Sequence, residues 1–385
     1  MSAAAGAGRG PRDAAPAPRH LYLHVPFCAE RCDYCAFVTY SGVDHLHERY
    51  SEALLTELAL RTSELGGATA TSVFFGGGTP SRLDPSLLGS VLSAMDLAPG
   101  CEVTVEVNPE DASVETLSAL VDHGVNRFSV GIQSTSPLVL RELGRTHRGD
   151  EIAALRRAVR ASGVERWSVD LIVGARHETD AMVEATILDV LDADDAPGHV
   201  SCYLLTPERG TPLGRDVARH PDEDVLAARY ELVDELLGAR GYGWYEISNW
   251  ARVGEACRHN QLYWRQGDYL GLGAAAHSHR QGRRSWNVAN LETYLDRVER
   301  GALPLAGEER VTGSSAAFER LALALRTVDG VPAEAFSDLE GLEGFLELHG
   351  ERVVLTRQGR LLADELVRRL DVAGAEVSSP QSARR

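Results

Sequence analysis

The chain has 385 residues, and its 39 basic and 56 acidic residues give it a formal net charge of −17. So strong a negative balance argues against binding to nucleic acid through a general basic surface. No lysine occurs in the sequence, which excludes Schiff-base catalysis by lysine, a P-loop nucleotide site and a protein kinase, because each of these needs a lysine amine.

The two ends of the chain are expected to lie outside the folded core. Residues 1–19 are rich in Ala, Gly and Pro and predict a disordered leader, and residues 373–385 predict a disordered tail. The leader lacks the apolar centre of a signal peptide. No apolar run approaches the roughly 18 residues that span a bilayer. We therefore expect a cytoplasmic protein whose thiols stay reduced.

Apolar, strand-like runs alternate with helix-like segments through residues 20–220. Strands are predicted at 21–25, 72–75, 103–107, 127–132, 167–173 and 199–205. Helices are predicted between them at 46–65, 85–95, 113–123, 137–143, 152–162 and 180–191. This alternation predicts an α/β fold with parallel strands that is two units short of a complete (β/α)8 barrel. A partial (β/α)6 barrel and a doubly wound sheet both fit the pattern.

After residue 220 the alternation weakens, and two further parts are predicted. Residues 221–311 are expected to form a connecting region, which begins with a helix at 223–240 and carries the segment CRHNQLYW at 257–264. Residues 312–372 predict a helix, then a strand and a short turn in VVLTRQGR, then a final helix. This order is typical of a small α+β, winged-helix-like domain, although the acidic balance argues against DNA as its partner.

Three cysteines follow the first predicted strand in the segment HVPFCAERCDYCAF. Functional side chains of barrels and doubly wound sheets gather after the carboxyl ends of strands. Thiolates spaced like Cys28, Cys32 and Cys35 can hold three corners of a 4Fe–4S cluster and leave the fourth iron open to a small molecule. The alternative is a structural zinc ion, which needs a fourth ligand. The nearest candidates for that ligand are His24, His45 and His47.

The C-x3-C-x2-C spacing directly after a first strand resembles the radical S-adenosylmethionine (radical SAM) superfamily, whose fold is a partial (β/α)6 barrel. The resemblance implies that the open iron binds the methionine part of S-adenosylmethionine, and that the reduced cluster cleaves this nucleotide to a 5′-deoxyadenosyl radical. It also implies that the loop FFGGGTPS contacts the methionine part. The residues concerned are Gly76, Gly77, Gly78 and Thr79.

Further residues are similar to those of one branch of this superfamily, the oxygen-independent coproporphyrinogen III oxidases and their relatives. The resemblance implies nucleotide contacts for Tyr22, Tyr34, Glu106, Gln133, Arg145 and Asp170, and for Leu204 by position. Taken singly, each of these side chains also has an ordinary structural interpretation. Their joint placement after successive strands favours the nucleotide site. The loop after the fifth strand departs from the branch, because Ala175 and Arg176 stand where it often has Leu and Pro.

A second departure distinguishes two functions. The oxidases carry a fourth cysteine two residues after the third, where this chain has Phe37. Phe37 and the segment CRHNQLYW resemble the HemW heme chaperones. The resemblance implies a protein that binds heme and delivers it to acceptor proteins of the respiratory chain. The alternative is an oxidase that decarboxylates the propionates of coproporphyrinogen III. A peripheral contact with a membrane and a homodimer are both left open.

The heme contact implied by this resemblance is His259, because imidazole is the usual ligand of heme iron. Cys257 offers a nearby thiolate, and Tyr263 and Trp264 offer flat faces that suit a porphyrin. A buried hydrogen-bond network around the histidine is the alternative interpretation. Two further histidines are rival ligands, His277 and His279.

Overall fold

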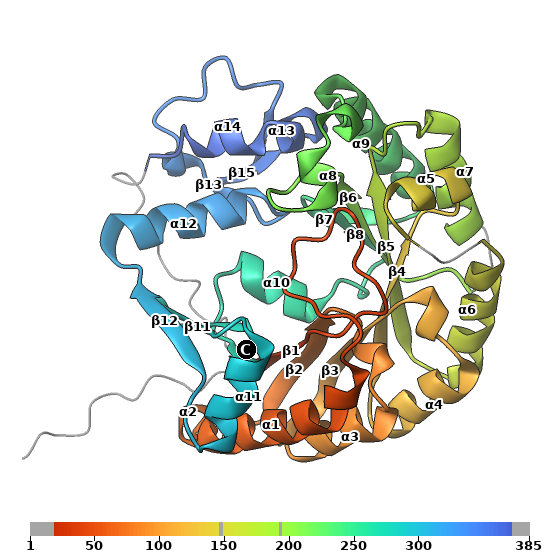
Figure 1. Ribbon diagram of the computed structural model, residues 1–385. Coiled ribbons are helices and arrows are strands. Elements are labelled where there is room, and N and C mark those ends of the chain that lie inside the picture. Colours follow the sequence, from red (N-terminus) through yellow and green to blue (C-terminus); the bar gives the residue numbers. More distant parts are fainter. Residues whose placement is uncertain (1–18, 146–148, 192–194, 372–385) are drawn as a thin grey trace, which may run out of the picture.

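In the computed structural model, residues 19–145, 149–191 and 195–371 are described. A nine-stranded sheet lies at the centre, in the order β7-β8-β6-β5-β4-β3-β2-β1-β9 (Figure 1). The first six strands are β1 (His20–Val25), β2 (Ala70–Gly77), β3 (Leu97–Val107), β4 (Arg127–Gln133), β5 (Arg166–Val173) and β6 (His199–Leu204). They lie side by side in chain order and are all parallel. The predicted partial (β/α)6 barrel is thereby confirmed. Apart from Arg19, the predicted leader and tail lie outside the described residues.

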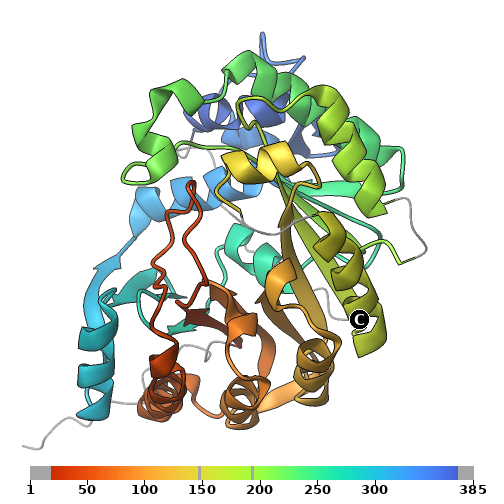
Figure 2. The same cartoon turned by 45° about the vertical axis from the view of Figure 1, so that its right-hand side comes forward.

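Helices cover the outer face of this curved sheet (Figure 2). They are α1 (His47–Leu60), α2 (Thr62–Leu65), α3 (Pro85–Ser93), α4 (Val114–Asp122), α6 (Gly149–Ser162) and α7 (Asp180–Leu191). The short α5 (Pro137–Glu142) follows β4 and packs in a separate small hydrophobic cluster at the carboxyl ends of the strands. The single helix predicted at 46–65 is interrupted at Arg61. This side chain is 2% exposed and reaches inward to Glu57 and Asn287, and its backbone leaves the helical region at φ −94° and ψ 5°.

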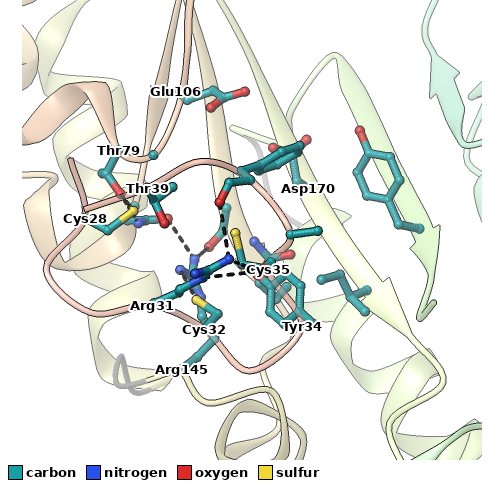
Figure 3. Close-up of a pocket in the computed structure, with 18 of the residues that line it drawn as sticks. Cys28, Arg31, Cys32, Tyr34, Cys35, Thr39, Thr79, Glu106, Arg145 and Asp170 are labelled. Atoms are coloured by element: carbon teal, nitrogen blue, oxygen red, sulfur yellow. Dashed lines mark hydrogen bonds between the residues drawn. The ribbon is translucent and has the colours of Figure 1, made fainter. Parts of the chain in front are cut away.

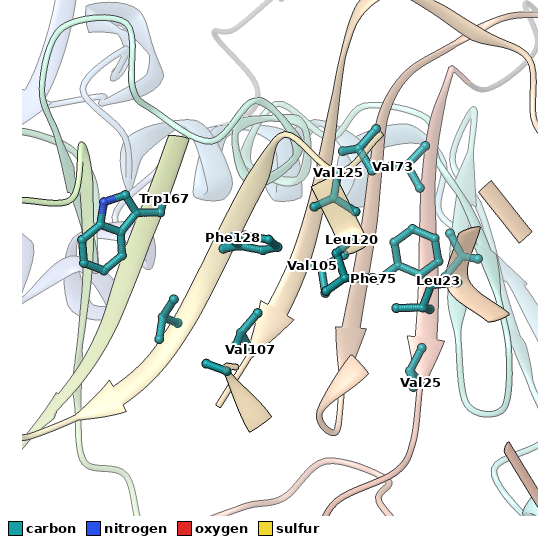
Figure 4. Packing of buried hydrophobic residues seen from close by; sticks show 14 of the residues in the cluster. Leu23, Val25, Val73, Phe75, Val105, Val107, Leu120, Val125, Phe128 and Trp167 are labelled. Atoms are coloured by element: carbon teal, nitrogen blue, oxygen red, sulfur yellow. The ribbon is translucent and has the colours of Figure 1, made fainter. Parts of the chain in front are cut away.

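The core lies between the sheet and these helices, because alternate side chains of each strand point to the outer face of the sheet. Figure 4 shows the apolar side chains that pack there. They include Leu23, Val25, Val73, Phe75, Val105 and Phe128, all 0% exposed. The side chains between them face the inside of the barrel and are mostly polar. The strands therefore bury one face against helices and present the other to a functional interior.

Residues 221–311 contribute to the same sheet. After α8 (Pro212–Arg215), they supply α9 (Glu223–Gly238), β7 (Gly243–Glu246), β8 (Asn249–Ala251), α10 (Arg258–Trp264) and β9 (Leu270–Leu272). β9 pairs with β1 in parallel, and β8 pairs with β6 antiparallel. A separate antiparallel sheet follows, made of β10 (His277–Arg280), β11 (Arg283–Asn287) and β12 (Leu305–Arg310). The helix α11 (Leu291–Glu299) lies between its last two strands in the sequence.

The last part of the chain has its own hydrophobic cluster. Its elements are α12 (Gly313–Leu325), β13 (Val331–Pro332), β14 (Leu346–His349), β15 (Arg352–Leu355), α13 (Arg357–Leu361) and α14 (Ala363–Val367). The three strands form a small antiparallel sheet, as expected for an α+β domain. Asp234 of α9 ties this part to the barrel through ion pairs with Arg357 at 2.5 Å and Arg360 at 2.8 Å. Within the described residues, no helix is long and apolar enough to cross a membrane.

Candidate functional site

A cavity of about 440 Å³ opens at the carboxyl ends of the parallel strands (Figure 3). Most of the predicted site residues line it. They are Cys28, Cys32, Tyr34, Cys35, Gly77, Gly78, Thr79, Glu106, Gln133, Arg145, Asp170 and Leu204. Three predicted residues do not line it, namely Tyr22, Gly76 and His259. The structure thus brings together side chains that lie up to 176 residues apart in the sequence, from Cys28 to Leu204.

The three cysteines lie on the loop between β1 and α1. The base of this loop is closed by two backbone hydrogen bonds, from Cys28 to Tyr40 at 3.0 Å and from Tyr40 to Pro26 at 2.7 Å. Arg31 crosses the loop and donates to the Cys35 carbonyl at 3.2 Å. Burial raises the pKa of the Cys28 thiol to about 11. The loop therefore presents three cysteine side chains to one cavity.

The thiols line a wall of the cavity and do not converge on one point. In the parts of the chain that the structure describes, no three His, Cys, Asp or Glu side chains are placed to hold a single metal ion. A tetrahedral zinc site would need its ligands within about 2.3 Å of one atom. A 4Fe–4S cluster instead offers a separate iron to each cysteine.

The glycine run at the end of β2 packs against the backbone at the start of the cysteine loop. A Cβ atom on Gly78 would lie 2.6 Å from the carbonyl oxygen of Phe27, and one on Gly77 would lie 2.5 Å from the His24 ring. Gly77 also has a φ of 117°, which favours glycine. Thr79 donates its backbone N–H to Phe27 at 2.7 Å and places its hydroxyl 3.9 Å from Cys28 Sγ. The glycines therefore allow close approach to the loop as well as to the cavity.

Arg145 joins the cysteine loop to the strand ends. Its guanidinium donates to Cys32 Sγ at 3.5 Å, to Asn108 Oδ1 at 2.8 Å and to the Gly131 carbonyl at 2.6 Å. Asn108 in turn donates to the Thr79 hydroxyl at 2.7 Å. The buried Nε of Arg145 has no hydrogen-bond partner among the described residues. The Nε–H of Arg145 is therefore a buried donor beside the cavity that the network leaves without an acceptor.

Two buried carboxyl groups face the cavity from β3 and β5. Burial, and then the neighbouring Asp170, raise the pKa of Glu106 to about 8. Glu106 accepts the backbone N–H of Gly77 at 3.0 Å. Burial also raises the pKa of Asp170, against a hydrogen bond from Ser129 at 3.2 Å. Paired carboxyl groups in such a place suit a ligand that brings positive charge or hydroxyl donors.

Gln133 ends β4 in a strained conformation. Its φ of 64° lies in the left-handed region, which is uncommon for residues other than glycine, and the register of β4 against β5 shifts at this point. The shift directs the side chain of Gln133 into the cavity. Strain of this kind is concentrated at functional sites.

The opposite wall of the cavity is apolar. It is formed by Ile172, Tyr203, Leu204 and Leu205 from the ends of β5 and β6. Phe37 lies at the rim and is 66% exposed. The cavity therefore has a polar side against the cysteine loop and an apolar side against the sixth strand.

His259 lies away from this cavity, inside the barrel on α10 (Figure 1). It is 1% exposed. Its Nδ1 is 2.7 Å from the Ser72 hydroxyl and its Nε2 is 2.9 Å from the Tyr263 hydroxyl. Its backbone N–H donates to Glu102 at 3.0 Å. Both ring nitrogens are therefore engaged, which favours the buried network over a direct bond to iron. Its role as a heme contact stays a prediction.

Tyr22 also faces the barrel interior. Its hydroxyl is 3.0 Å from His24 Nδ1, and the other nitrogen of that ring is 2.9 Å from the Val38 carbonyl in the cysteine loop. Phe74 stacks between Tyr22 and His259, with ring centroids at 6.3 Å and 5.3 Å. Tyr22 is thus linked to the cysteine loop through the hydrogen bonds of His24. Its direct contact with a nucleotide stays a prediction.

Several cavity residues were missed by the sequence analysis. They are Arg31, Thr39, Ser129 and Tyr203. Asn108 also lines the cavity, and its position directly after the third predicted strand had marked it as a candidate. Arg31 and Thr39 lie on an irregular loop, whose path carries no periodic signal.

Comparisons with known proteins agree with this geometry. The profile of the Radical SAM superfamily matches residues 22–190. The heme chaperone HemW of Mycobacterium tuberculosis is 40% identical over 373 residues, which cover 92% of this chain and 95% of that protein. HemW of Bacillus subtilis is 31% identical and covers 90% of this chain and 98% of its own. A solved structure, coproporphyrinogen III oxidase (HemN) from Escherichia coli, has a similar fold, with a TM-score of 0.80 at 22% identity over 92% of this chain and 90% of that one.

Proposed function

Because this chain belongs to the HemW family of the radical SAM superfamily, we propose that it is a heme chaperone. In this proposal it carries a 4Fe–4S cluster, binds S-adenosylmethionine and delivers heme to acceptor proteins. The observation that carries the proposal is the cavity that joins the three cysteines, on the loop after β1, to residues at the ends of the next five strands. A match over nine-tenths of the chain supports the same function for the whole protein.

Cys28, Cys32 and Cys35 would hold the cluster. The thiols must lose their protons to bind iron, and burial, which raises the pKa of Cys28, makes the release of the proton from this thiol part of binding. When bound, the cluster supplies one electron at low potential and an open iron. The hydrogen bond from Arg145 to Cys32 Sγ would stabilise the added negative charge.

S-adenosylmethionine would occupy the remaining cavity. The nucleotide carries a sulfonium and an ammonium group, which suit the paired carboxyl groups of Glu106 and Asp170. Its carboxylate suits the Arg145 guanidinium. The apolar wall around Leu204 suits the adenine ring. Bound cationic ligand would favour the ionised form of Glu106, and would thus lower the pKa that burial raises.

Phe37 favours the chaperone over the oxidase. The third cluster cysteine is followed by Ala36 and Phe37, and the exposed phenyl ring stands at the rim of the cavity where a fourth thiol would stand in an oxidase. A phenyl ring can neither ligate metal nor exchange protons. The likeness to coproporphyrinogen III oxidase is at 22% identity and concerns the fold.

The acceptors are proposed to be heme proteins of the respiratory chain, and the chaperone is proposed to act from the cytoplasm. The test is an anaerobic assay of the reconstituted full-length chain. One arm measures transfer of heme to an apo-cytochrome, and the other measures carbon dioxide released from coproporphyrinogen III with S-adenosylmethionine and a reductant. We expect heme transfer and no carbon dioxide. Carbon dioxide at catalytic rates would assign the chain to the oxidases.

A further inference from the structure

One imidazole outside the cavity is free to bind a metal. His277 is the first residue of β10, and its side chain is exposed. Neither of its ring nitrogens forms a hydrogen bond with any residue in the described ranges. The rival His279 is buried, with Nδ1 3.0 Å from the Gly267 carbonyl. His259 has both nitrogens engaged. Of the three histidines considered as heme ligands, His277 alone has an exposed side chain with neither ring nitrogen hydrogen-bonded to a described residue.

The ring of His277 is held by an indole on the next strand. His277 and Trp286 are directly opposite each other in the antiparallel pair of β10 and β11. Their ring centroids are 5.9 Å apart, and the ring planes differ by 25°. Gly307 of β12 faces Trp286 from the other side, and a Cβ there would lie 2.6 Å from the indole. The glycine therefore makes room for the indole, and the indole fixes the plane of the imidazole.

The segment that follows β11, the strand of Trp286, contacts the base of the cysteine loop. The chain that leaves β11 reaches Ala289, whose carbonyl accepts the Tyr40 hydroxyl at 2.9 Å. The same hydroxyl accepts the backbone N–H of Leu291 at 3.2 Å. Tyr40 closes the base of the cysteine loop. Two segments, one bearing the cysteines and one bearing the stacked rings, thus meet at a single tyrosine.

His277 is also in the chemical form that binds iron. Partial burial, and then the nearby Arg284, lower its pKa, so the ring is neutral at physiological pH. Neutral imidazole is the form that ligates metals. Arg284 itself is engaged by Glu309 and Glu319, and does not compete for the ring.

We propose that His277 is the axial ligand through which this protein holds heme iron, with Trp286 as the residue that positions the imidazole. The inference rests on the proposed chaperone function and names the residue that performs it. A heme chaperone must release its heme to an acceptor protein. An acceptor can displace an exposed ligand on a strand without unfolding the barrel. A ligand at His259 would require the hydrogen bonds to Ser72 and Tyr263 to break first.

The test is a titration of the reconstituted, full-length chain with ferric heme (hemin), read as difference spectra in the Soret band. We expect His277→Ala to shift the Soret maximum and to weaken binding by about tenfold or more. His277→Gly should regain the original maximum when imidazole is added. Trp286→Phe keeps a flat ring and should retain the wild-type spectrum, whereas Trp286→Ala should broaden it. His349→Ala, on the exposed β14, is the matched control and should bind as the wild type does.

The outcomes separate the two proposals. If the wild-type chain binds no hemin, the chaperone function fails and this inference with it. If the wild type binds hemin and His277→Ala gives the same Soret maximum and the same Kd, the chaperone function stands and His277 is not the ligand. Iron and sulfide content, measured on each variant, shows that the cluster and the fold are retained.

Discussion

The guanidinium of Arg145 lies 3.5 Å from the Sγ of Cys32, across 113 residues of sequence. The same group also contacts Asn108 and the Gly131 carbonyl. One buried cation therefore connects the loop that carries the thiols with the ends of two strands. A cation here both holds the loop and offsets negative charge at the cysteines.

Replacing this cation should weaken nucleotide binding more than cluster assembly. We expect Arg145→Met to lower the affinity for S-adenosylmethionine by about tenfold or more, because a charge-assisted pair with the ligand carboxylate is lost. Arg145→Lys keeps the charge without the fork and should give a smaller loss. Equilibrium binding to the reconstituted chain measures both. An unchanged Kd in Arg145→Met would remove Arg145 from the ligand site.

Glu106 should make the apo-protein less stable as the pH rises. Its carboxyl ionises near 4.5 in the unfolded chain and near 8 in the folded chain. Between these values the unfolded chain has released a proton that the folded chain keeps, so stability falls as pH increases. Glu106→Gln removes this dependence. Its melting temperature should exceed that of the wild type by more at pH 8 than at pH 5. Burial also raises the pKa of Glu178, to about 7. This residue is present in both proteins, so its contribution to the pH dependence cancels in the difference between their melting temperatures. An equal difference at the two pH values would contradict the buried placement of Glu106.

Gly78 should tolerate no side chain. The nearest atoms to an added Cβ belong to the backbone of Phe27, at 2.6 Å and 2.9 Å, and a backbone cannot rotate away. We expect Gly78→Ala to destabilise the protein by about 1–3 kcal/mol and to lower its iron content on reconstitution. Gly238→Ala is the matched control, because nothing lies within 4 Å of its Cβ. That variant should gain up to about 1 kcal/mol, since it lies in a helix. Equal effects of the two substitutions would contradict the packing described.

His259 should matter for stability rather than for the heme spectrum. His259→Ala leaves the Tyr263 hydroxyl without its partner, leaves the Ser72 hydroxyl with His20 alone, and opens space beside Phe74. We expect a loss of about 2–4 kcal/mol in the free energy of unfolding, measured by denaturant titration. The Soret maximum with hemin should stay unchanged. A displaced maximum in a variant that remains folded would return the ligand role to His259.

The barrel could be predicted from the sequence because the signals for each of its strands and helices lie within short stretches of the chain. Each of the six parallel strands is a short apolar run such as Val103 to Val107, bounded by turns, and parallel strands separated by helices have few alternatives. Site residues could be predicted for the same reason. Periodicity alone locates the strands in which Glu106, near the end of β3, and Asp170, within β5, lie, and the family resemblance then gave them roles.

What could not be predicted depends on contacts between distant segments. Nothing near Leu270 indicates that β9 pairs with β1, and nothing in CRHNQLYW distinguishes a helix inside the barrel from one on the surface. His259 is buried because Ser72 and Glu102, far away in the sequence, supply its partners. The break at Arg61 has the same origin, since Asn287 draws the side chain inward. Pairing of this kind is set by tertiary packing and not by local propensity.

The central claim is that Cys28, Cys32 and Cys35 together hold one iron–sulfur cluster. The most direct measurement is the iron, sulfide and zinc content of the anaerobically reconstituted chain, compared with each single Cys→Ala variant and with Cys101→Ala as the control. The account predicts about four iron and four sulfide per chain, lost in each of the three variants and kept in the control. Stoichiometric zinc without sulfide, or iron that survives the loss of any one of the three thiols, would contradict it.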